Sequence, residues 1–355
     1  MKTYLLSALS IAVIMGCGEK KEKSTTPPPV EKKQAMVEVV SKEADKKVDI
    51  LIDGKVFTSY IYPSTIKKPV LWPVVTSGGN EVTRNFPMKN KAGERVDHPH
   101  HVGIWLNYGD VNGLDFWNNS DAIPAENADK YGTILHQSIK NTKSGEGQGS
   151  LETTSVWNDI NGNTLLDESS QFVFKADGDV RVIDRTTTLT AKGQKVTFTD
   201  NKEGMFAIRV TRELELPSDK AMELSDSHGV ITKVASPDNS SVTGDYLSSE
   251  GITGEDVWAT RAKWMKLAGK LNGEDIALVI IDHPKNVGYP TYWHARSYGL
   301  FSANTLGQKI FSKGETELNF ALEAGESVTF KYRFAVISGA IPEGKIKELT
   351  NSFGN

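Results

Sequence analysis

The sequence predicts an all-β fold, a large antiparallel β-sandwich that ends in one short helix. Short segments that alternate apolar and polar residues recur along the chain, and Gly, Asn or Asp turn signals separate them. No helical periodicity precedes residue 342. Because the roughly 300 residues of 48–355 contain no internal Pro/Gly linker, we expect them to form one two-sheet domain.

The first predicted element is a hairpin of 48–52 with 55–62 around Asp53-Gly54, the strongest short-range hairpin signal. Two further hairpins are predicted around Asn161-Gly162 and Lys192-Gly193, joining 155–160 to 164–174 and 180–189 to 195–200. Later strands are expected at 207–216, 258–267, 276–282, 317–322 and 327–337, and a terminal helix within 342–353. The loop-rich region 75–149 has a composition better suited to a site than to a core.

The start of the chain predicts export. Lys2 precedes an apolar stretch over 5–15 and then Gly16-Cys17, which is the pattern of a signal peptide. The stretch is shorter than the roughly 20 residues that a membrane-spanning helix needs. Ile14-Met15-Gly16-Cys17 also resembles the bacterial lipobox, which implies lipidation of Cys17; the alternative is an ordinary secretory signal.

Residues 18–47 are rich in Lys, Glu, Ser, Thr and Pro, so they are expected to form a disordered tether. The sequence therefore predicts a cell-envelope lipoprotein, held on the periplasmic side or on the outer surface of the outer membrane. Cys17 is the only cysteine, which excludes an intrachain disulfide and a thiolate zinc site. The net charge of -4 gives no reason to expect nucleic acid as a partner.

Asp97-His98-Pro99-His100-His101 holds three of the seven histidines. His100 and His101 are candidate acid or base groups, because imidazole titrates near neutral pH. In an extended segment His98 and His100 share a face and could bind a divalent metal. The alternative is a histidine cluster that only stiffens its loop.

Aromatic and polar residues then alternate through 103–117. Aromatic rings stack on the C–H faces of sugars while carboxylates and amides bind hydroxyls, so this run predicts a carbohydrate site. Its candidate substrate-binding residues are Trp105, Asp110, Asn112, Asp115 and Trp117. The alternative is that the tryptophans belong to the core and the polar residues cap turns.

Two more segments supply candidate chemistry. Glu203, beside Gly204, is a candidate base, and Arg209 lies on the strand that follows. His294 and Arg296 would share a strand face and suit an anionic or strongly polar substrate group. For Glu203 and Arg296 the alternative is a structural ion pair.

A set of segments resembles the PmoA-like family of secreted bacterial proteins. The set comprises Thr83-Arg84, 97–101, 109–117, 202–205 with Arg209, and 293–301 with Asn304. The resemblance implies a secreted β-protein of polysaccharide-degrading bacteria, with a supersandwich like that of galactose mutarotase. Methane oxidation, which the family label suggests, conflicts with the lack of long apolar spans. Arg84 and Asn304 join the candidate substrate-binding residues.

These observations predict an enzyme that acts on an oligosaccharide or a polysaccharide-derived substrate, as a lyase, an epimerase or a hydrolase. No cofactor is required, and a divalent metal is an option. A lyase or epimerase needs a base and a cation, whereas a hydrolase normally needs two carboxylates. The alternative function is that of a non-catalytic glycan-binding lipoprotein. The oligomeric state stays open.

Overall fold

The structure is a computed structural model that describes residues 34–354, together with Met1 and Ala12. The expected signal peptide, its lipobox and Cys17 fall outside the described residues, as does the segment 18–33. In the described part of the chain no helix is both long enough and apolar enough to cross a membrane.

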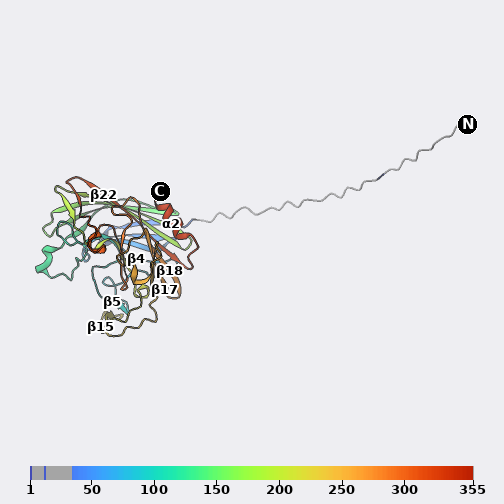
Figure 1. The fold of residues 1–355 in the computed structure, drawn as a ribbon, viewed down its shortest axis with the longest axis horizontal. Coiled ribbons are helices and arrows are strands. Elements are labelled where there is room, and N and C mark those ends of the chain that lie inside the picture. The colour runs from blue at the N-terminus through green and yellow to red at the C-terminus, as the bar shows by residue number, and fades with distance from the viewer. Residues whose placement is uncertain (2–11, 13–33, 355) are drawn as a thin grey trace. The chain divides into compact units, whose positions relative to one another are not determined.

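Most of the strand residues lie in two large sheets whose strand pairs are all antiparallel, as the sequence predicts (Figure 1). The first has nine strands, in the order β19 (Tyr292–Ala295), β20 (Leu300–Asn304), β13 (Gly204–Arg209), β6 (Ile104–Tyr108), β4 (Val70–Val74), β3 (Lys55–Ile61), β2 (Lys47–Ile52), β1 (Met36–Lys42) and β8 (Gly145–Glu146). The second has eight, in the order β16 (Asp245–Ser248), β17 (Trp264–Leu271), β18 (Glu274–Asp282), β22 (Ser327–Ser338), β11 (Val180–Ala191), β10 (Thr164–Asp177), β9 (Gln148–Asn158) and β7 (Thr133–Lys143).

Smaller elements connect these sheets. Two short sheets pair β12 (Val196–Phe198) with β21 (Phe320–Leu322), and β15 (Ile231–Val234), β14 (Met222–Ser225) and β5 (Glu94–Arg95). The helices are α1 (Gln308–Phe311) and the predicted terminal helix α2 (Lys345–Gly354). Short 3-10 turns are η1 (Glu43–Asp45), η2 (Ala125–Lys130), η3 (Arg212–Leu214) and η4 (Gly254–Val257).

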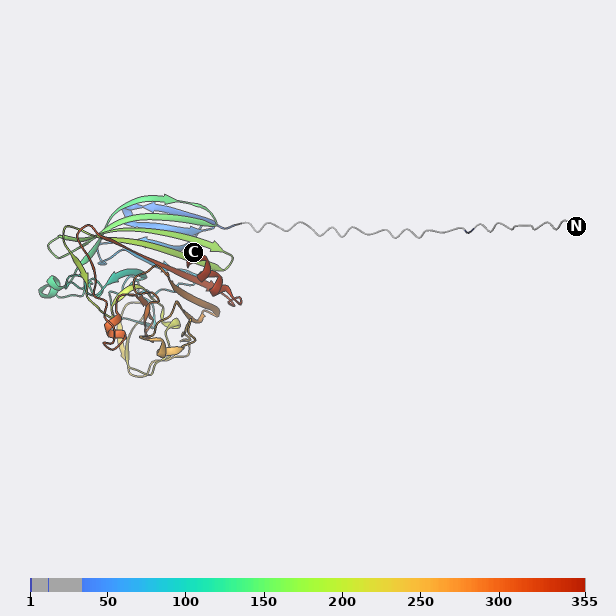
Figure 2. The ribbon, with the colours of Figure 1, turned by 45° about the horizontal axis from the view of Figure 1, so that its top comes forward.

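The two large sheets pack face to face around one apolar core. Figure 2 shows β1 to β3, in blue, and β9 to β11, in green, as two layers. Alternate residues of each strand point inward, so that Val48 and Ile50 of β2 meet the same buried cluster as Phe172 and Phe174 of β10. Burial of these side chains stabilises the sandwich by about 1.5–3 kcal/mol each.

The fold begins earlier than the sequence predicts. The expected tether ends at residue 47, but β1 pairs with β2 over its whole length, from Val37 opposite Ile52 to Lys42 opposite Lys47. Val37 and Val39 point into the core, while Met36 and Val40 are exposed and Glu38 between the two buried residues is partly exposed. This alternation is short and lies in a charged segment, which explains why composition alone suggested a tether.

One predicted hairpin is also wrong. The hairpins around Asp53-Gly54 and Asn161-Gly162 form as expected. The strand after Lys192-Gly193 does not pair back onto β11, because β10 and β22 already occupy both edges of β11. It becomes β12 and pairs with β21 instead.

At one end of the nine-stranded sheet, the face that points away from the main core positions the candidate site. His294 on β19 is paired with Ser302 on β20, Ser302 with Ala207 on β13, and Ala207 with Trp105 on β6. Directly paired residues of antiparallel strands point to the same side, so these four side chains form one row on the face away from the main core. Small side chains in the middle of this row leave space above the sheet.

Candidate functional site

The loop 97–101 lies over this row and is held by two buried arginines. Arg84 donates to the carbonyl oxygens of Asp97, His98 and His101 and to the carboxylate of Asp97. Arg209 donates to Asp97 Oδ1 at 2.6 Å and to His101 Nδ1 at 3.2 Å. Both guanidinium groups are fully buried. Arg84 and Arg209 therefore position the loop, which corrects the expectation that they bind substrate.

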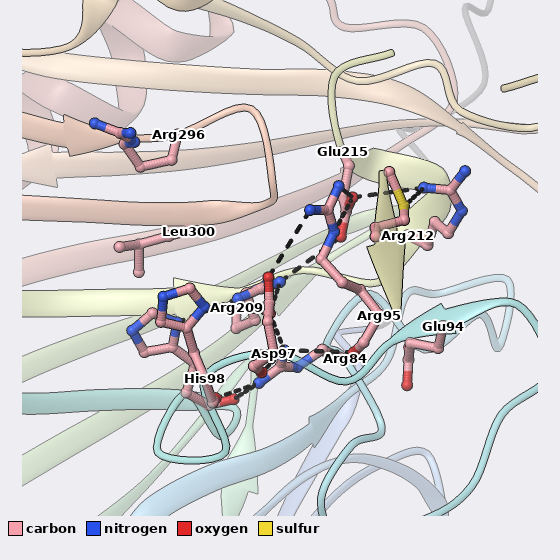
Figure 3. A network of polar contacts seen from close by, with 12 residues as sticks. Arg84, Glu94, Arg95, Asp97, His98, Arg209, Arg212, Glu215, Arg296 and Leu300 are labelled. Atoms are coloured by element: carbon pink, nitrogen blue, oxygen red, sulfur yellow. Dashed lines mark hydrogen bonds and ion pairs between the residues drawn. The ribbon is translucent and has the colours of Figure 1, made fainter. Parts of the chain in front are cut away.

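Asp97 is the anionic centre of this network (Figure 3). Burial alone would raise its pKa, but the hydrogen bond from His98 and the charges of Arg209 and Arg84 outweigh burial and hold that pKa well below its usual range. The carboxylate is thus ionised at neutral pH. Its Oδ1 atom lies 3.3 Å from His98 Nδ1. An ionised carboxylate accepts from an imidazole N–H, so in neutral His98 this contact favours the tautomer with the proton on Nδ1 and the lone pair on Nε2.

Among the candidate histidines, His98 is the accessible one, with 41% of its side chain exposed. Its ring lies between those of Tyr298 and His101, parallel to both, with centroids 5.1 and 4.9 Å away. His98 also has a positive φ of 44°. A non-glycine residue in this region is uncommon and is held there by its surroundings, here by the carbonyl contact to Arg84 and the two ring contacts.

His100 and His101 do not suit the expected proton transfer. Burial lowers the pKa of His100 to about 2 and that of His101 well below its usual value, and neighbouring positive charges add to both shifts. Both Nε2 atoms are buried without a hydrogen-bond partner among the described residues. Neutral, buried imidazoles support the loop and the ring stack; this corrects their expected catalytic role.

The expected metal pair also has a different geometry. The rings of His98 and His100 meet edge to face, with centroids 5.6 Å apart. Within residues 34–354, no three or more His, Cys, Asp or Glu side chains gather where they could hold a metal ion. In the part of the chain that is described, the pair thus has no third protein ligand.

A second histidine lies at the other end of the row. His294 Nδ1 is 2.9 Å from the carbonyl oxygen of Lys202, which can only accept, so Nδ1 donates and Nε2 carries the lone pair. Glu203 lies beside it, with Oε2 3.6 Å from His294 Nδ1, and also contacts Lys202 Nζ. Burial lowers the pKa of His294 to about 3, and the charges of Lys202 and Arg296 add to this shift. His294 is therefore a neutral hydrogen-bonding group at pH 7.

Tyr298 contacts both parts of the candidate site, the 97–101 loop through His98 and the 294–298 segment through Arg296. It stacks on His98 and lies under the guanidinium groups of Arg209 and Arg296, 4.9 and 5.8 Å from its ring centroid. Burial raises the pKa of Tyr298 to about 12, and the charges of Glu203 and Asp97 act in the same direction. The structure thus brings the 97–101 loop, Glu203 and the 294–298 segment together around this ring.

Beside Tyr298 lies a polar pocket of about 300 Å³. It is lined by Arg95, Ser218, Lys220, Glu255, Trp258, Ala295, Arg296, Ser297 and Tyr298. Arg296 is the one predicted substrate-binding residue that reaches it. In Figure 3, Arg296 stands apart from the network around Asp97 and no dashed line joins it to another residue.

The tryptophans of the segment 103–117 belong to the buried interior of the protein. Trp105 and Trp117 are fully buried and pack against each other edge to face, 5.2 Å between centroids. Such rings present no face to a sugar, so the expected stacking is corrected. They form the wall under His101, whose ring lies 5.2 Å from that of Trp105.

The polar residues of the run cap turns, which was the alternative interpretation. Asp110 accepts from the Gly113 N–H, Asn112 bonds the backbone of 195–197, and Asp115 accepts from two N–H groups that follow it. Asn304 is buried and donates to the carbonyl oxygens of Asn201 and Lys202, so it positions Glu203. These four residues were expected to bind substrate, and their polar atoms are instead engaged by the chain itself.

Sequence reasoning missed four residues of this region. Asp97 and Tyr298 carried a signal, since each is next to or near a candidate residue in the chain. Arg95 and Glu215 carried none, because their 3.2 Å ion pair joins segments that are distant in sequence. Burial raises the pKa of Glu215 to about 7, although the charges of Arg209 and Arg95 oppose that shift.

Comparison with solved structures gives distant similarities. The galactosidase domain of an alpha-galactosidase–sucrose kinase aligns with 85% of this chain and 42% of its own at 9% identity and a TM-score of 0.41. A GH36 alpha-galactosidase from Geobacillus stearothermophilus aligns with 85% of this chain and 40% of its own at 13% identity and a TM-score of 0.35. The chain thus spans about two fifths of these two proteins. A galactose mutarotase related enzyme from Lactobacillus acidophilus aligns with 87% of this chain and 99% of its own at 8% identity and a TM-score of 0.29.

No curated protein is significantly similar to the chain in sequence. A family model matches residues 47–351, and it is not that of the PmoA-like family. The resemblance to PmoA-like proteins is therefore wrong; the segments behind it, such as the 97–101 loop and 293–301, are built around the buried arginine network described above. The chain belongs to the family of unknown function DUF6807.

Proposed function

We propose that the protein is a carbohydrate-active enzyme that moves protons at a sugar ring, as a lyase or an epimerase. One observation carries the proposal: His98, oriented by Asp97, is 41% exposed and stacks on Tyr298, which lines the pocket together with Arg296. A carboxylate that fixes the tautomer and orientation of an imidazole is the arrangement of a general base.

The second histidine supports the same chemistry. His294 precedes Ala295, a pocket residue, and its Nε2 atom can accept a hydrogen bond from a sugar hydroxyl. Glu203 lies 3.6 Å from the opposite nitrogen. If His294 takes a proton during the reaction, this carboxylate stabilises the resulting cation.

Hydrolysis by paired carboxylates has less support. Such enzymes use two carboxyl groups, one as acid and one as base or nucleophile. Asp97 already binds Arg84 and Arg209 and is held ionised, and among the residues that line the pocket Glu255 is the single carboxylate. Elimination and epimerisation need a base and a cation near the developing negative charge, and His98 and Arg296 provide both.

The pocket also suits a sugar. Tyr298 and Trp258 line it together with hydroxyl groups of Ser218 and Ser297. Ring faces pack against the C–H groups of a sugar, and hydroxyls exchange hydrogen bonds with it. Its volume of about 300 Å³ is at the small end of small-molecule sites.

The test is turnover of a panel of neutral and acidic oligosaccharides by the purified protein. His98→Gln should lower turnover by about 10²–10⁴-fold, and Glu203→Gln should also lower it. His228→Gln is the matched control, because His228 is an exposed turn residue distant in sequence from the site. Full turnover by both site variants would refute the proposal. Binding that is flat from pH 5 to 8 without product on prolonged incubation would favour a glycan-binding protein.

We also propose that the protein is a lipoprotein of the cell envelope, anchored through Cys17. The support is the signal-peptide pattern that ends in Ile14-Met15-Gly16-Cys17. Membrane and soluble fractions of cells that express the wild type and Cys17→Ala test it. The wild type should fractionate with membranes and label with a fatty acid probe. Equal distribution and no label in both forms would refute the anchor.

A further inference from the structure

We propose that the substrate of this site is a uronate, a sugar residue that carries a carboxylate, and that Arg296 binds this carboxylate. The inference rests on the proposed function and specifies its substrate class. It is carried by the charge and the aromatic surroundings of the pocket beside Tyr298, which is lined by three cationic side chains and one carboxylate.

The cations of the pocket differ in what they already bind. Arg95 is paired with Glu215 at 3.2 Å and lies 3.9 Å from Asp97. Within residues 34–354, no hydrogen bond or ion pair is found for the guanidinium of Arg296 or the ammonium of Lys220. Glu255 opposes them with a single charge. The pocket therefore has an excess of positive charge that an anionic ligand would neutralise.

Arg296 is held in place without using its hydrogen-bond donors. Its guanidinium lies 5.6 Å from the ring centroid of Trp258 and 5.8 Å from that of Tyr298. Contacts with ring faces restrict the side chain and leave the N–H groups available. A planar guanidinium binds a carboxylate through two parallel hydrogen bonds, so Arg296 has the chemistry for this group.

The position of the carboxylate also fits the proton transfer. In a uronate the C–H bond next to the carboxylate is the acidic one, because negative charge spreads onto the carboxylate oxygens, and a cation bound there stabilises it. Tyr298 lines the pocket and stacks on His98, which places the imidazole next to the bound sugar. Arg296 and His98 would then act on adjacent atoms of one substrate.

The two reactions balance as follows. In both, His98 Nε2 takes the proton from C5, and the C–H electron pair moves toward the carboxylate. In elimination this pair forms the C4=C5 double bond, the C4–O4 bond breaks, and O4 leaves with a proton from the imidazolium or from water. In epimerisation a water molecule gives a proton to C5 from the opposite face, the hydroxide that remains is neutralised by the proton that the imidazolium releases, and no bond between the sugar and oxygen breaks.

The experiment is calorimetric binding of galacturonate, glucuronate, galactose, galactose 6-sulfate and galactose 6-phosphate to the purified protein. A uronate should bind more tightly than galactose, and Arg296→Gln should lower its affinity by about ten- to hundredfold while leaving the affinity for galactose unchanged. Arg296→Lys should lose less than Arg296→Gln. Lys140→Gln is the control, because Lys140 is exposed on β7 in the other large sheet.

The outcomes separate this inference from the proposed function. Equal affinity for uronates and galactose, or no effect of Arg296→Gln, overturns the uronate assignment even if a neutral sugar is turned over. Tighter binding of the sulfated or phosphorylated sugar than of the uronates also overturns it. Uronate binding that depends on Arg296, without product from any uronate-containing oligosaccharide of the turnover panel, supports the inference and refutes the enzyme. Ultraviolet absorbance of a new conjugated double bond distinguishes elimination from epimerisation.

Discussion

The Nδ1 atom of His98 lies 3.3 Å from Oδ1 of Asp97, and the same oxygen accepts hydrogen bonds from Arg84 and Arg209. One carboxylate therefore orients the accessible imidazole and balances two fully buried cations. Stability and activity are coupled at this residue, because the charge that holds the loop also fixes the histidine tautomer.

Replacement of Asp97 with Asn should lower both the stability of the protein and its activity. The change leaves Arg84 without its ion-pair partner and Arg209 with only Glu215, 3.8 Å away. An uncompensated buried charge costs about 3–5 kcal/mol. Asp97 is 29% exposed, so we expect the lower end of this range, measured by urea denaturation. Asp167→Asn is the control, because Asp167 and its partner Lys192 are about half exposed; its effect should stay within about 0.5 kcal/mol. A similar loss in both variants would contradict the assigned role.

His294 should make stability depend on pH in the mildly acidic range. Its pKa is about 3 in the folded protein, so the folded state binds this proton less readily than the unfolded state does. The contribution of His294 is complete above the unfolded value of about 6.5 and is lost as pH falls toward 3, by up to about 1.4 kcal/mol per unit.

The measurement compares unfolding of the wild type and His294→Gln at pH 7, 6 and 5. The difference between the two isolates this residue from other groups, including Glu215 and Asp282, whose pKa values are raised to about 7 by burial and which titrate in the opposite direction. The wild type should lose stability relative to the variant as pH falls. Parallel pH profiles would show that His294 is not held neutral.

Gly103 should be the least replaceable glycine near the site. It has a φ of +58°, and a Cβ atom there would lie 2.2 Å from the carbonyl oxygen of Leu71. Gly113 also has a positive φ, +81°, but nothing lies within 4 Å of a Cβ. Gly113→Ala should cost about 1–2 kcal/mol through backbone strain alone. Gly103→Ala should cost at least about 1–3 kcal/mol more, because β4 and β6 must separate. Equal melting temperatures would refute this.

The sequence was a good guide where a pattern is local. Alternation around Asp53-Gly54 and Asn161-Gly162 predicted two hairpins that form. Prediction from the sequence failed where the pairing of a strand depends on a partner that is distant in the chain. The strand after Lys192-Gly193 pairs with β21 because β11 is already paired on both edges.

The candidate site shows the same division. Sequence patterns pointed to the histidine loop, Glu203 and the 294–296 segment, and in the structure His98 stacks on Tyr298 while Glu203 lies 3.6 Å from His294. Their roles could not be predicted, because a pattern does not reveal whether a charged or aromatic side chain is buried. Arg84 and Trp105 carry suitable chemistry for a ligand, but both are fully enclosed. His98 is 41% exposed and has a positive φ, and neither feature has a signal in the sequence.

Tyr298 should act through its ring rather than its hydroxyl group. The ring stacks on His98 at 5.1 Å and lies between Arg209 and Arg296, whereas burial raises the hydroxyl pKa to about 12 and keeps the group protonated. Tyr298→Phe should therefore keep most of the turnover of an active oligosaccharide. Tyr298→Ala should lose about tenfold to hundredfold in kcat, since displacement of a catalytic base by about 1 Å has effects of this size. If Tyr298→Phe loses as much as Tyr298→Ala, the hydroxyl group takes part in the chemistry and the stack is not its main role.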